Sequence, residues 1–275
     1  MSLSKSRPFG RILLGGVLPA LLLIVWHIVT SKGVMPEYLL PSPPSVVKTL
    51  LSFIFGSKDY QTDYTGTFLK HASASVLRVS GGFSLAMIIG IPTGILSGRS
   101  NRISAFIDPF VQLIRSVPGI SWLPLAMVWF GIGNTTTIFL ISLAAFFPVY
   151  INTFHGARNV PVRWLQSAKM LGAGRMYILF RVVLPGIMPS IESGLRLALG
   201  ISWAYVVLGE LTGVNQGLGA MIMDARVLGD VRLVIVGIIS IAVLGRITDM
   251  ILSAALRHMP GHSPALSELR HMHKG

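Results

Sequence analysis

The longest uncharged stretch of the chain, residues 116–157, runs for 42 residues without an Asp, Glu, Lys or Arg. A helix that crosses the hydrocarbon core of a membrane uses about 20 residues, so this stretch is too long for one span. Glycines and Asn134 interrupt it at residues 130–137, FGIGNTTT, where a turn is expected. Over the whole chain only 12% of residues are charged, against about 25% in soluble domains. The sequence therefore predicts a protein that crosses a membrane more than once.

Further apolar runs complete a predicted fold that is all-α and polytopic, with six transmembrane helices. We expect them at residues 12–29, 68–96, 104–132, 135–154, 187–211 and 233–252. Pro92 should kink the second of these spans, and Pro118 and Pro124 should disturb the third. The first run could instead be a signal peptide, but its 18 residues lack an Ala-x-Ala-like exit, so an uncleaved span is favoured.

Polar segments divide the chain into three predicted parts. Residues 1–67 hold a tail, the first span and an outer segment with a short amphipathic helix at 46–55, and the prolines at 41–44 should exclude helix there. Residues 68–256 form the core, which includes a polar loop at 158–185, and residues 257–275 form a second tail. No metal site is expected in this tail, because nothing there fixes a tetrahedral geometry. Its histidines are His258, His262, His271 and His273.

Basic residues dominate the charge of the chain, which amounts to +13. Such an excess can indicate nucleic-acid binding, but here the basic residues lie in the gaps between apolar runs. Six spans place both termini on one side, and that side collects 13 Lys and Arg, against 6 on the other. Because cytoplasmic loops are rich in Lys and Arg, we expect both termini and residues 158–185 on the cytoplasmic side of a bacterial inner membrane. The partners expected there include membrane lipids and exclude nucleic acid.

The polar loop at 158–185 has a helical pattern of its own. Apolar residues recur at helical spacing on either side of Gly172, which predicts two short helices joined at a glycine hinge and ended by Pro185. Its basic residues include Arg163, Lys169, Arg175 and Arg181, and it contains no acidic residue. A cytoplasmic helix pair of this kind lies on lipid headgroups or fits the groove of a partner.

Within this loop a set of spaced residues resembles the EAA loop of ABC-importer permeases. The matching residues are Gln166, Ser167, Ala168, Gly172, Val182, Leu184 and Pro185. Two of them depart from the family pattern, since Gln166 replaces Glu and Ser167 replaces Ala. The resemblance implies that the loop is the coupling helix that docks into an ATPase subunit.

The resemblance extends over residues 68–256, where the stretches at 117–133, 184–211 and 217–226 resemble permeases of the aliphatic sulfonate, taurine and nitrate group. It implies a type I importer permease fold, a homodimer, a cytoplasmic ATPase dimer and a periplasmic or lipid-anchored solute-binding protein. The implied solute is a small molecule, first of all an organic sulfonate or a related anion. Because the chain has no Gly-x-x-x-x-Gly-Lys-Ser/Thr loop, ATP and Mg²⁺ are expected on the partner, and no catalytic residue is expected here.

Charged and aromatic residues within the spans are candidates for the translocation path, because a charge in a membrane is costly. The candidates are Arg115, Trp122, Trp129, Trp203, Glu210, Asn215 and Gly217. Each has an ordinary alternative, since tryptophans often only pack or anchor a helix. Asn215 and Gly217 could form a flexible gate turn or an ordinary loop.

The charged candidates have ordinary alternatives in ion pairs. Glu210 could line a gate, pair with Arg226 or sit at a solvated helix end. Arg115 could attract an anion or pair with Asp108. Two further pairs are expected to satisfy each other at helical spacing, namely Glu192 with Arg196 and Arg246 with Asp249.

Other sequence features leave alternatives open. Gly90, Gly94 and Gly98 fall four apart and permit a close helix contact, although glycine is also common in membrane helices. A secondary transporter would need inverted repeats and acids in broken helices, and no repeat is found. An intramembrane enzyme would need a His pair or an activated Ser within a span, and a channel would act without ATP. The chain has no cysteine, which excludes disulfides and thiolate chemistry.

Overall fold

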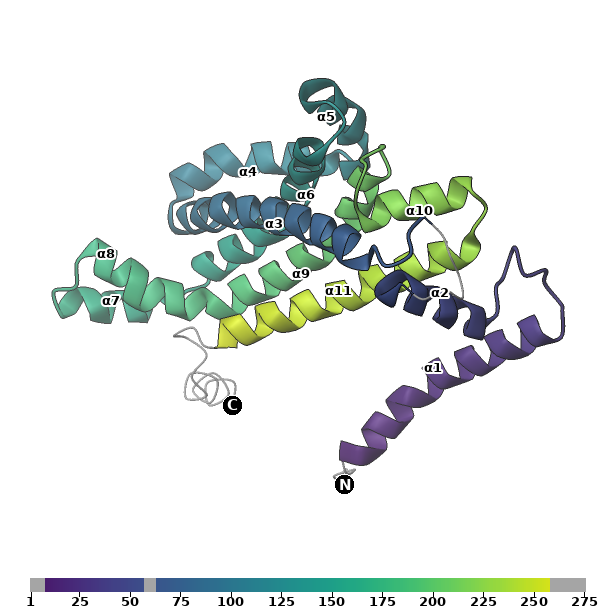
Figure 1. The fold of residues 1–275 in the computed structure, drawn as a ribbon. Helices are drawn as coiled ribbons and strands as arrows, with labels where there is room; N and C mark the ends of the chain where they lie inside the picture. Colours follow the sequence, from purple (N-terminus) through teal and green to yellow (C-terminus); the bar gives the residue numbers. More distant parts are fainter. Residues whose placement is uncertain (1–7, 57–62, 258–275) are drawn as a thin grey trace. The chain divides into compact units, whose positions relative to one another are not determined.

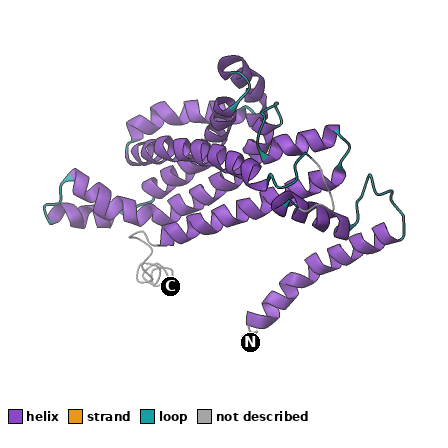
Figure 2. Cartoon of the chain, viewed as in Figure 1, coloured by secondary structure: helices purple, strands orange, loops and turns teal. Residues whose placement is uncertain are grey.

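The computed structural model describes residues 8–56 and 63–257, and in these ranges every regular element is helical (Figures 1 and 2). The all-α prediction is therefore confirmed for the described residues. The elements are α1 (Pro8–Ser31), α2 (Pro43–Phe55), α3 (Phe68–Arg99), α4 (Asn101–Ser116), the 3-10 turn η1 (Gly119–Trp122), α5 (Leu123–Phe130), α6 (Asn134–Arg158), α7 (Val162–Met170), α8 (Arg175–Ile178), the π-helical turn η2 (Leu179–Val183), α9 (Leu184–Glu210), α10 (Leu218–Val227) and α11 (Val231–Arg257).

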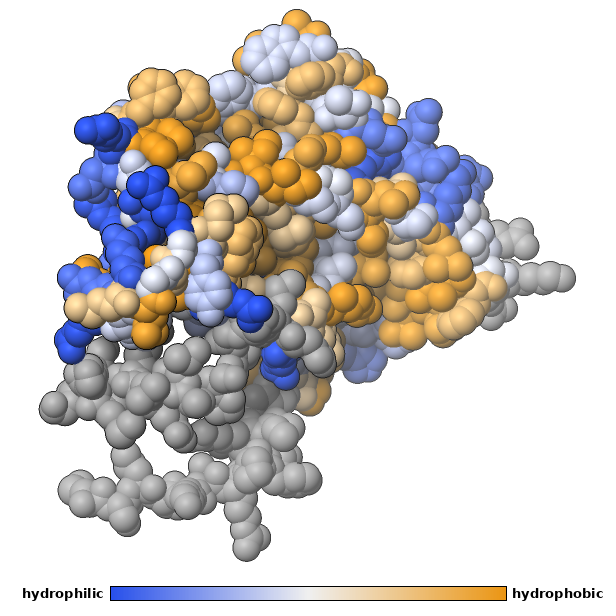
Figure 3. Space-filling view, turned by 90° about the vertical axis from the view of Figure 1, so that its left-hand side faces the viewer, coloured by the Kyte–Doolittle hydropathy of each residue, from blue (hydrophilic) through white to orange (hydrophobic). Residues whose placement is uncertain are grey.

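Four helical stretches of the described chain are long and apolar enough to cross a membrane. They are α3, α6, the continuous stretch Arg175–Glu210 and α11. A fifth candidate is the bent pair of α4 with Gly119–Phe130. The predicted first span, residues 12–29, lies within α1, which is 24 residues long. Figure 3 shows broad hydrophobic areas with hydrophilic residues gathered in separate clusters, as expected for such helices.

The third predicted span is interrupted near Pro118, as the sequence predicted, and it is not one continuous helix. α4 ends at Ser116, and Val117 is extended, with φ −80° and ψ 122°. The cause is Pro118, because the ring of a proline disfavours helical geometry in the residue before it. The chain resumes in η1 and α5 at an angle of 89° to α4. The predicted span is therefore either a broken crossing or a re-entrant segment.

Two further boundaries differ from the prediction. α2 begins at Pro43, so the prolines at 41–44 do not exclude helix throughout. Pro43 and Pro44 occupy the first turn, where the missing N–H would have no partner in any case. In addition, the glycine-rich segment before the last span contains the helix α10, which the sequence did not predict.

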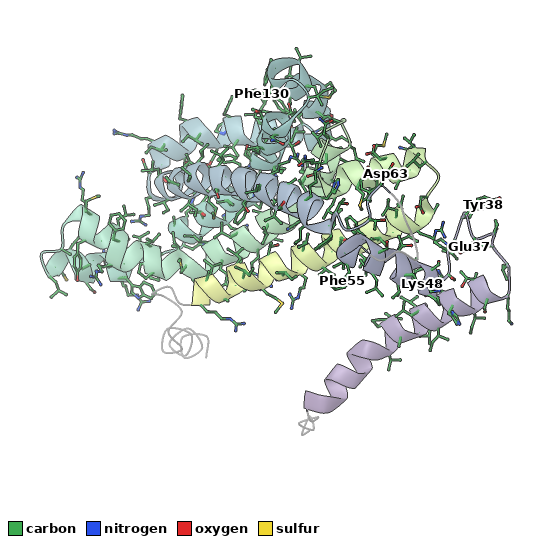
Figure 4. The ribbon with its side chains drawn as sticks, in the orientation of Figure 1. Glu37, Tyr38, Lys48, Phe55, Asp63 and Phe130 are labelled. Carbon is green, nitrogen blue, oxygen red and sulfur yellow. The ribbon has the colours of Figure 1, made fainter. Side chains whose placement is uncertain are left out.

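The described chain divides into two compact units, one from residues 1–71 with 221–239 and one from 72–220 with 240–275. The predicted division at residues 67 and 256 stays a prediction, and its second tail, with the four histidines, lies outside the described residues. In the first unit α2 is amphipathic, as predicted. It buries Val46 and Phe53, while Phe55 at its end is exposed before Gly56 caps the helix (Figure 4).

The first unit also contains a tyrosine–aspartate hydrogen bond that ties α10 to the segment before α3. The Tyr64 hydroxyl donates to the Asp224 carboxylate. Burial raises the pKa of the Tyr64 phenol above its usual value, and the bond to Asp224 raises it further. The phenol therefore stays protonated and can donate throughout the physiological range.

In the second unit α6 is the central helix, with Leu140, Ile141 and Ala145 almost fully buried. The glycine stripe of α3 packs on it. A Cβ atom at Gly90 or at Gly94 would lie within 3.0 Å of α6 atoms, and the same holds at Gly98. The predicted close helix contact is thus confirmed, because a side chain at these positions would push the two helices apart. α9 packs on another side of α6, where Gly194 lies against Asn152 and the carbonyl of Pro148.

Candidate functional site

The predicted helix pair of the polar loop is present, as α7 and α8 joined by a turn at Gly172 (Figure 1). The Gly172 N–H donates to the Lys169 carbonyl at 2.9 Å, and the Ala173 N–H donates to the Ala168 carbonyl at 3.0 Å. These two bonds form a Schellman motif, which requires a left-handed residue after the helix. Gly172 has φ +79°, so the role of this glycine as the joint is confirmed.

The predicted end of the second helix at Pro185 was wrong. Helix continues from Arg175 to Glu210, and Pro185 lies in the first turn of α9. Just before it, the Leu184 N–H bonds to the Leu179 carbonyl, five residues back, in a π-helical turn. Because of this widened π-helical turn, the helix continues through Pro185, although a proline has no N–H to donate. The loop is thus joined directly to a membrane-spanning helix.

The seven residues of the predicted coupling motif divide into two groups. Gln166, Ser167 and Gly172 are exposed on α7 and its turn. The other four are half-buried, and three of them pack against the hydrophobic core. These four are Ala168, Val182, Leu184 and Pro185. The motif therefore contains exposed residues that a partner could contact and half-buried residues that pack the segment against the rest of the protein.

Two apolar residues at the tip of this segment were not singled out from the sequence. Met170 is 89% exposed and Leu171 is 87% exposed, directly before Gly172. Their position at the end of a basic helix is the signal that could have identified them. We call these two residues the apolar tip. With the exposed Met176, Tyr177 and Phe180 nearby, the apolar tip makes an apolar surface on a basic segment, as is typical of a contact site.

A second site lies at the other end of α9, around Glu210. Its side chain is fully buried, and Oε1 accepts from the Arg78 guanidinium at 2.6 Å. The Ser75 hydroxyl donates to the same carboxylate at 2.8 Å, and the Gly219 N–H donates at 2.8 Å. The partner of Glu210 is therefore Arg78. The sequence alternatives, a pair with Arg226 or a solvated helix end, were wrong. Arg78 was missed, although an arginine inside the apolar run at 68–96 was a usable signal.

The same arginine ties together three segments of the chain. Its Nε donates to Asn134 Oδ1 at 2.7 Å, and NH1 also donates to the Gln216 carbonyl at 2.7 Å. The Leu218 N–H donates to Ser75 Oγ at 2.9 Å. The segment 213–219 is therefore held to α3 and to the start of α6. We call Arg78, Glu210 and Ser75 the buried latch.

A pocket of about 360 Å³ lies beside the buried latch. It is lined by Arg78, Ile132, Gly133, Asn134, Gly213, Val214, Asn215 and Gln216. Two of the predicted gate residues, Glu210 and Gly217, meet in the latch, where a Cβ atom on Gly217 would overlap the Glu210 carboxylate. The third, Asn215, lines the pocket. The structure brings these three residues near one another, and their part in a gate stays a prediction.

The tryptophan and arginine candidates lie elsewhere, and their part in a translocation path stays a prediction. Trp203 is buried and donates to the Thr248 hydroxyl at 2.9 Å, which is a packing contact. Trp129 is exposed and lies edge-on to Phe130, which Figure 4 labels. Trp122 is half-buried in η1, and Arg115 is exposed in the last turn of α4.

Several expected ion pairs have different partners. Asp108, the suggested partner of Arg115, accepts from the Ser104 and Tyr150 hydroxyls. Arg196 forms its bidentate ion pair with Asp249 across two helices, and Glu192 interacts with it electrostatically. The expected pair of Arg246 with Asp249 is confirmed, at 3.1 Å. Within the described ranges no group of three His, Cys, Asp or Glu could hold a metal ion, and His258, His262, His271 and His273 lie outside them.

Comparisons with known proteins agree with this architecture. Residues 90–259 match the family described as binding-protein-dependent transport system inner membrane component. The chain is 36% identical to the taurine transport system permease protein TauC of Escherichia coli, over 90% of this chain and 88% of that one. It is 38% identical to SsuC of Bacillus subtilis, named as a candidate aliphatic sulfonates transport permease, over 86% and 82% of the two chains.

A third relative is the bicarbonate transport system permease protein CmpB of Synechococcus elongatus, 35% identical over 82% of each chain. Among solved structures, a chain of the inward-facing MetNI methionine ABC transporter is similar with a TM-score of 0.56. That match covers 67% of this chain and 94% of the other, at 18% identity. At this identity the likeness concerns the fold alone.

Proposed function

The chain belongs to the family of binding-protein-dependent transport system inner membrane components, the ABC importer permeases, and from this we propose that it forms the path for a small anion. In this proposal two copies of the chain enclose the path across a bacterial inner membrane. A periplasmic or lipid-anchored binding protein delivers the solute, and a cytoplasmic ATPase dimer hydrolyses ATP with Mg²⁺. The chain itself is a non-catalytic subunit.

The observation that carries the proposal is the apolar tip, Met170 and Leu171, on a helix pair joined to a long helix. Exposed apolar side chains at a helix end fit a partner's groove. Because helix is continuous from Arg175 to Glu210, a displacement at the tip is passed to α9 as one body. The segment is thus suited to convert closure of an ATPase dimer into movement of the spans.

The buried latch lies at the far end of this helix and supports a role as the outer gate. The ion pair of Arg78 with Glu210 fixes the segment 213–219 beside the pocket. Buried charge pairs lose much stabilisation when one partner moves away, so such a gate has two distinct states rather than a continuum. Movement of α9 would carry Glu210 away from Arg78 and release the segment.

The names of the relatives support a small oxyanion as the solute. They are named for taurine, aliphatic sulfonates and bicarbonate, each of which carries a sulfonate or carbonate group. We therefore propose an organic sulfonate first, and a related small anion next. Uptake of a labelled alkanesulfonate that needs no ATP would point instead to a secondary transporter or a channel.

The experiment is co-purification of the chain with the ATPase expressed from the same cells, with ATP-dependent sulfonate uptake into proteoliposomes. Leu171→Asp places a charge on the apolar tip and should abolish both association and uptake. Arg102→Asp places the same charge on another turn of the predicted cytoplasmic side and should leave both unchanged. Retention of the ATPase by Leu171→Asp would refute docking at the tip.

A further inference from the structure

Two arginines share one carboxylate on the face formed by α9 and α11. Asp249 Oδ1 accepts from Arg196 Nε at 3.0 Å, and Oδ2 accepts from Arg196 NH2 at 3.1 Å. Arg246 NH1 donates to the same Oδ2 at 3.1 Å. Arg196 is therefore bound in the bidentate fork geometry, whereas Arg246 is bound at one nitrogen only. We call these three residues the charged triad.

The charged triad lies within two helices that are long and apolar enough to span the membrane. Arg196 lies in the middle of α9, about 18 Å along the axis from Leu184 and about 21 Å from Glu210, at 1.5 Å per residue. Arg246 lies close to the middle of α11. Yet the Arg196 side chain is 47% exposed and that of Arg246 is 69% exposed in the single chain. Exposing a charged side chain to lipid within a membrane-spanning helix is costly, so we expect this face to border water or protein.

Apart from Leu197, which is 58% exposed, the other exposed residues of α9 on this face are small or polar. Ser193 and Gly200 flank Arg196 at helical spacing, and Ala204 follows one turn later. A Cβ atom at Gly200 would have no neighbour within 4 Å. In contrast, α3 exposes large apolar side chains, such as Ile88, as a lipid-facing helix does. The charge of the α9 stripe and, apart from Leu197, its small side chains therefore distinguish it from the lipid-facing surface of α3.

The unshared N–H groups of the triad, rather than its net charge, favour an anion, because Glu192 balances the second guanidinium. Two guanidiniums face one carboxylate, and Glu192, half-buried one turn before Arg196, is the other acidic group nearby. Among the described residues, Arg246 bonds only through NH1, so its remaining N–H groups can donate to a ligand. The planar guanidinium fork matches the oxygens of a carboxylate or sulfonate.

From these observations we propose that the charged triad is an anion-binding station within a water-filled translocation path, with Arg246 as the group that contacts the sulfonate or related oxyanion. This inference rests on the proposed function for the existence of a path. It adds the location of the path, along the α9 face with Ser193 and Gly200, and the chemistry by which the solute is held there. Asp249 acts as a positioning residue that keeps the two guanidiniums apart and oriented.

The absence of cysteine from the chain allows a direct test. Gly200→Cys introduces a single thiol one turn from Arg196, in open space. The assembled transporter in nanodiscs is treated with 2-sulfonatoethyl methanethiosulfonate, itself a small sulfonate, or with its trimethylammonium counterpart. The sulfonate reagent should react about tenfold faster, relative to their rates with a free thiol, because the triad concentrates anions. Adding Arg246→Gln should remove most of this preference, and adding Arg246→Lys should retain part of it.

Ile88→Cys on α3 is the matched control, and it should react with neither reagent. If Gly200→Cys does not react either, the face is covered by lipid or by a second helix, and the proposal is overturned. Reaction without charge preference would overturn the anion station and leave only a path. The labelling is read on this chain and needs no hydrolysis, so it can also be done in membrane vesicles without the ATPase. Failure of ATP-driven uptake would therefore bear on the proposed function and not on this site.

Discussion

Glu210 illustrates how a buried charge is made tolerable by its surroundings. Arg78 neutralises it, and the Ser75 hydroxyl and Gly219 N–H occupy further lone pairs of the carboxylate. A buried carboxylate left without such partners would be strongly destabilising. Sequence reasoning identified Glu210 because an acid in an apolar run is conspicuous. It could not identify the partner, because Arg78 is 132 residues away and only the fold brings them together.

A glycine next to this carboxylate provides a prediction at the same scale. Gly217→Ala would force the Glu210 carboxylate out of its position, and Ser75, Arg78 and Gly219 prevent it from simply swinging aside. We expect a loss of about 1–3 kcal/mol beyond backbone strain, the usual cost of a disrupted buried hydrogen bond. The measurement is the midpoint of thermal unfolding in detergent, together with hydrogen exchange of the Leu218 amide.

Gly213→Ala is the matched control for this variant. Gly213 also has positive φ, at +102°, but a Cβ atom there would meet nothing within 4 Å. It therefore imposes backbone strain without displacing Glu210. Equal unfolding midpoints for the two variants would show that the latch does not stabilise the segment 213–219.

At the scale of elements, the sequence predicted long helices better than their interruptions. The boundaries of α6 and α11 fall within a few residues of the expected spans, because apolar length decides them. Pro185 was given too much weight, since a proline in a first turn does not stop a helix that enters through a widened turn. The disturbance predicted at Pro118 is confirmed, since its effect falls on Val117 and breaks the third span.

The joint between α7 and α8 leads to a prediction about coupling. Gly172→Val places a branched side chain at φ +79°, a conformation that costs about 1–2 kcal/mol without glycine. The Schellman motif should open and the apolar tip should lose its fixed position. We expect solute-stimulated ATPase activity of the assembled complex to fall at least tenfold, while the chain still inserts in the membrane.

Gly174→Val tests whether any bulk at this joint has the same effect. Gly174 lies two residues away with φ −69°, and a Cβ atom there has no neighbour within 4 Å. Valine is therefore accommodated without strain, and ATPase stimulation should persist. Loss of stimulation in both variants would mean that steric bulk, rather than the geometry of the turn, disturbs coupling.

For the whole molecule, composition and apolar run length were enough to predict an all-α polytopic membrane protein. The importer permease fold was implied by the resemblance of the loop and of several other stretches, and the comparisons confirm it. Composition and apolar run length were not enough to predict the partners of the charged residues. Glu192 and Arg196 are at ideal spacing on one helix, but Arg196 pairs with Asp249, 53 residues away. A pair between neighbouring helices depends on how the spans assemble, which no local pattern records.

Orientation in the membrane is the remaining prediction at this scale, and it rests on the distribution of Lys and Arg. About 36 helical residues, Arg175–Glu210, separate the coupling segment from the pocket segment, or about 54 Å at 1.5 Å per residue. This exceeds the roughly 30 Å hydrocarbon core, so the two ends must emerge on opposite sides. From the excess of basic residues we expect residues 158–185 in the cytoplasm.

Single cysteines in the otherwise cysteine-free chain can decide this orientation. A membrane-impermeant maleimide added to intact spheroplasts should label Asn215→Cys, which is exposed beside the pocket, and should not label Gly174→Cys. In inside-out vesicles the pattern should reverse, because the two positions lie on opposite sides of the membrane, which the reagent does not cross. Labelling of Gly174→Cys from outside would place the apolar tip away from any cytoplasmic ATPase. The tip could then not transmit nucleotide-driven closure, however well its geometry suits that role.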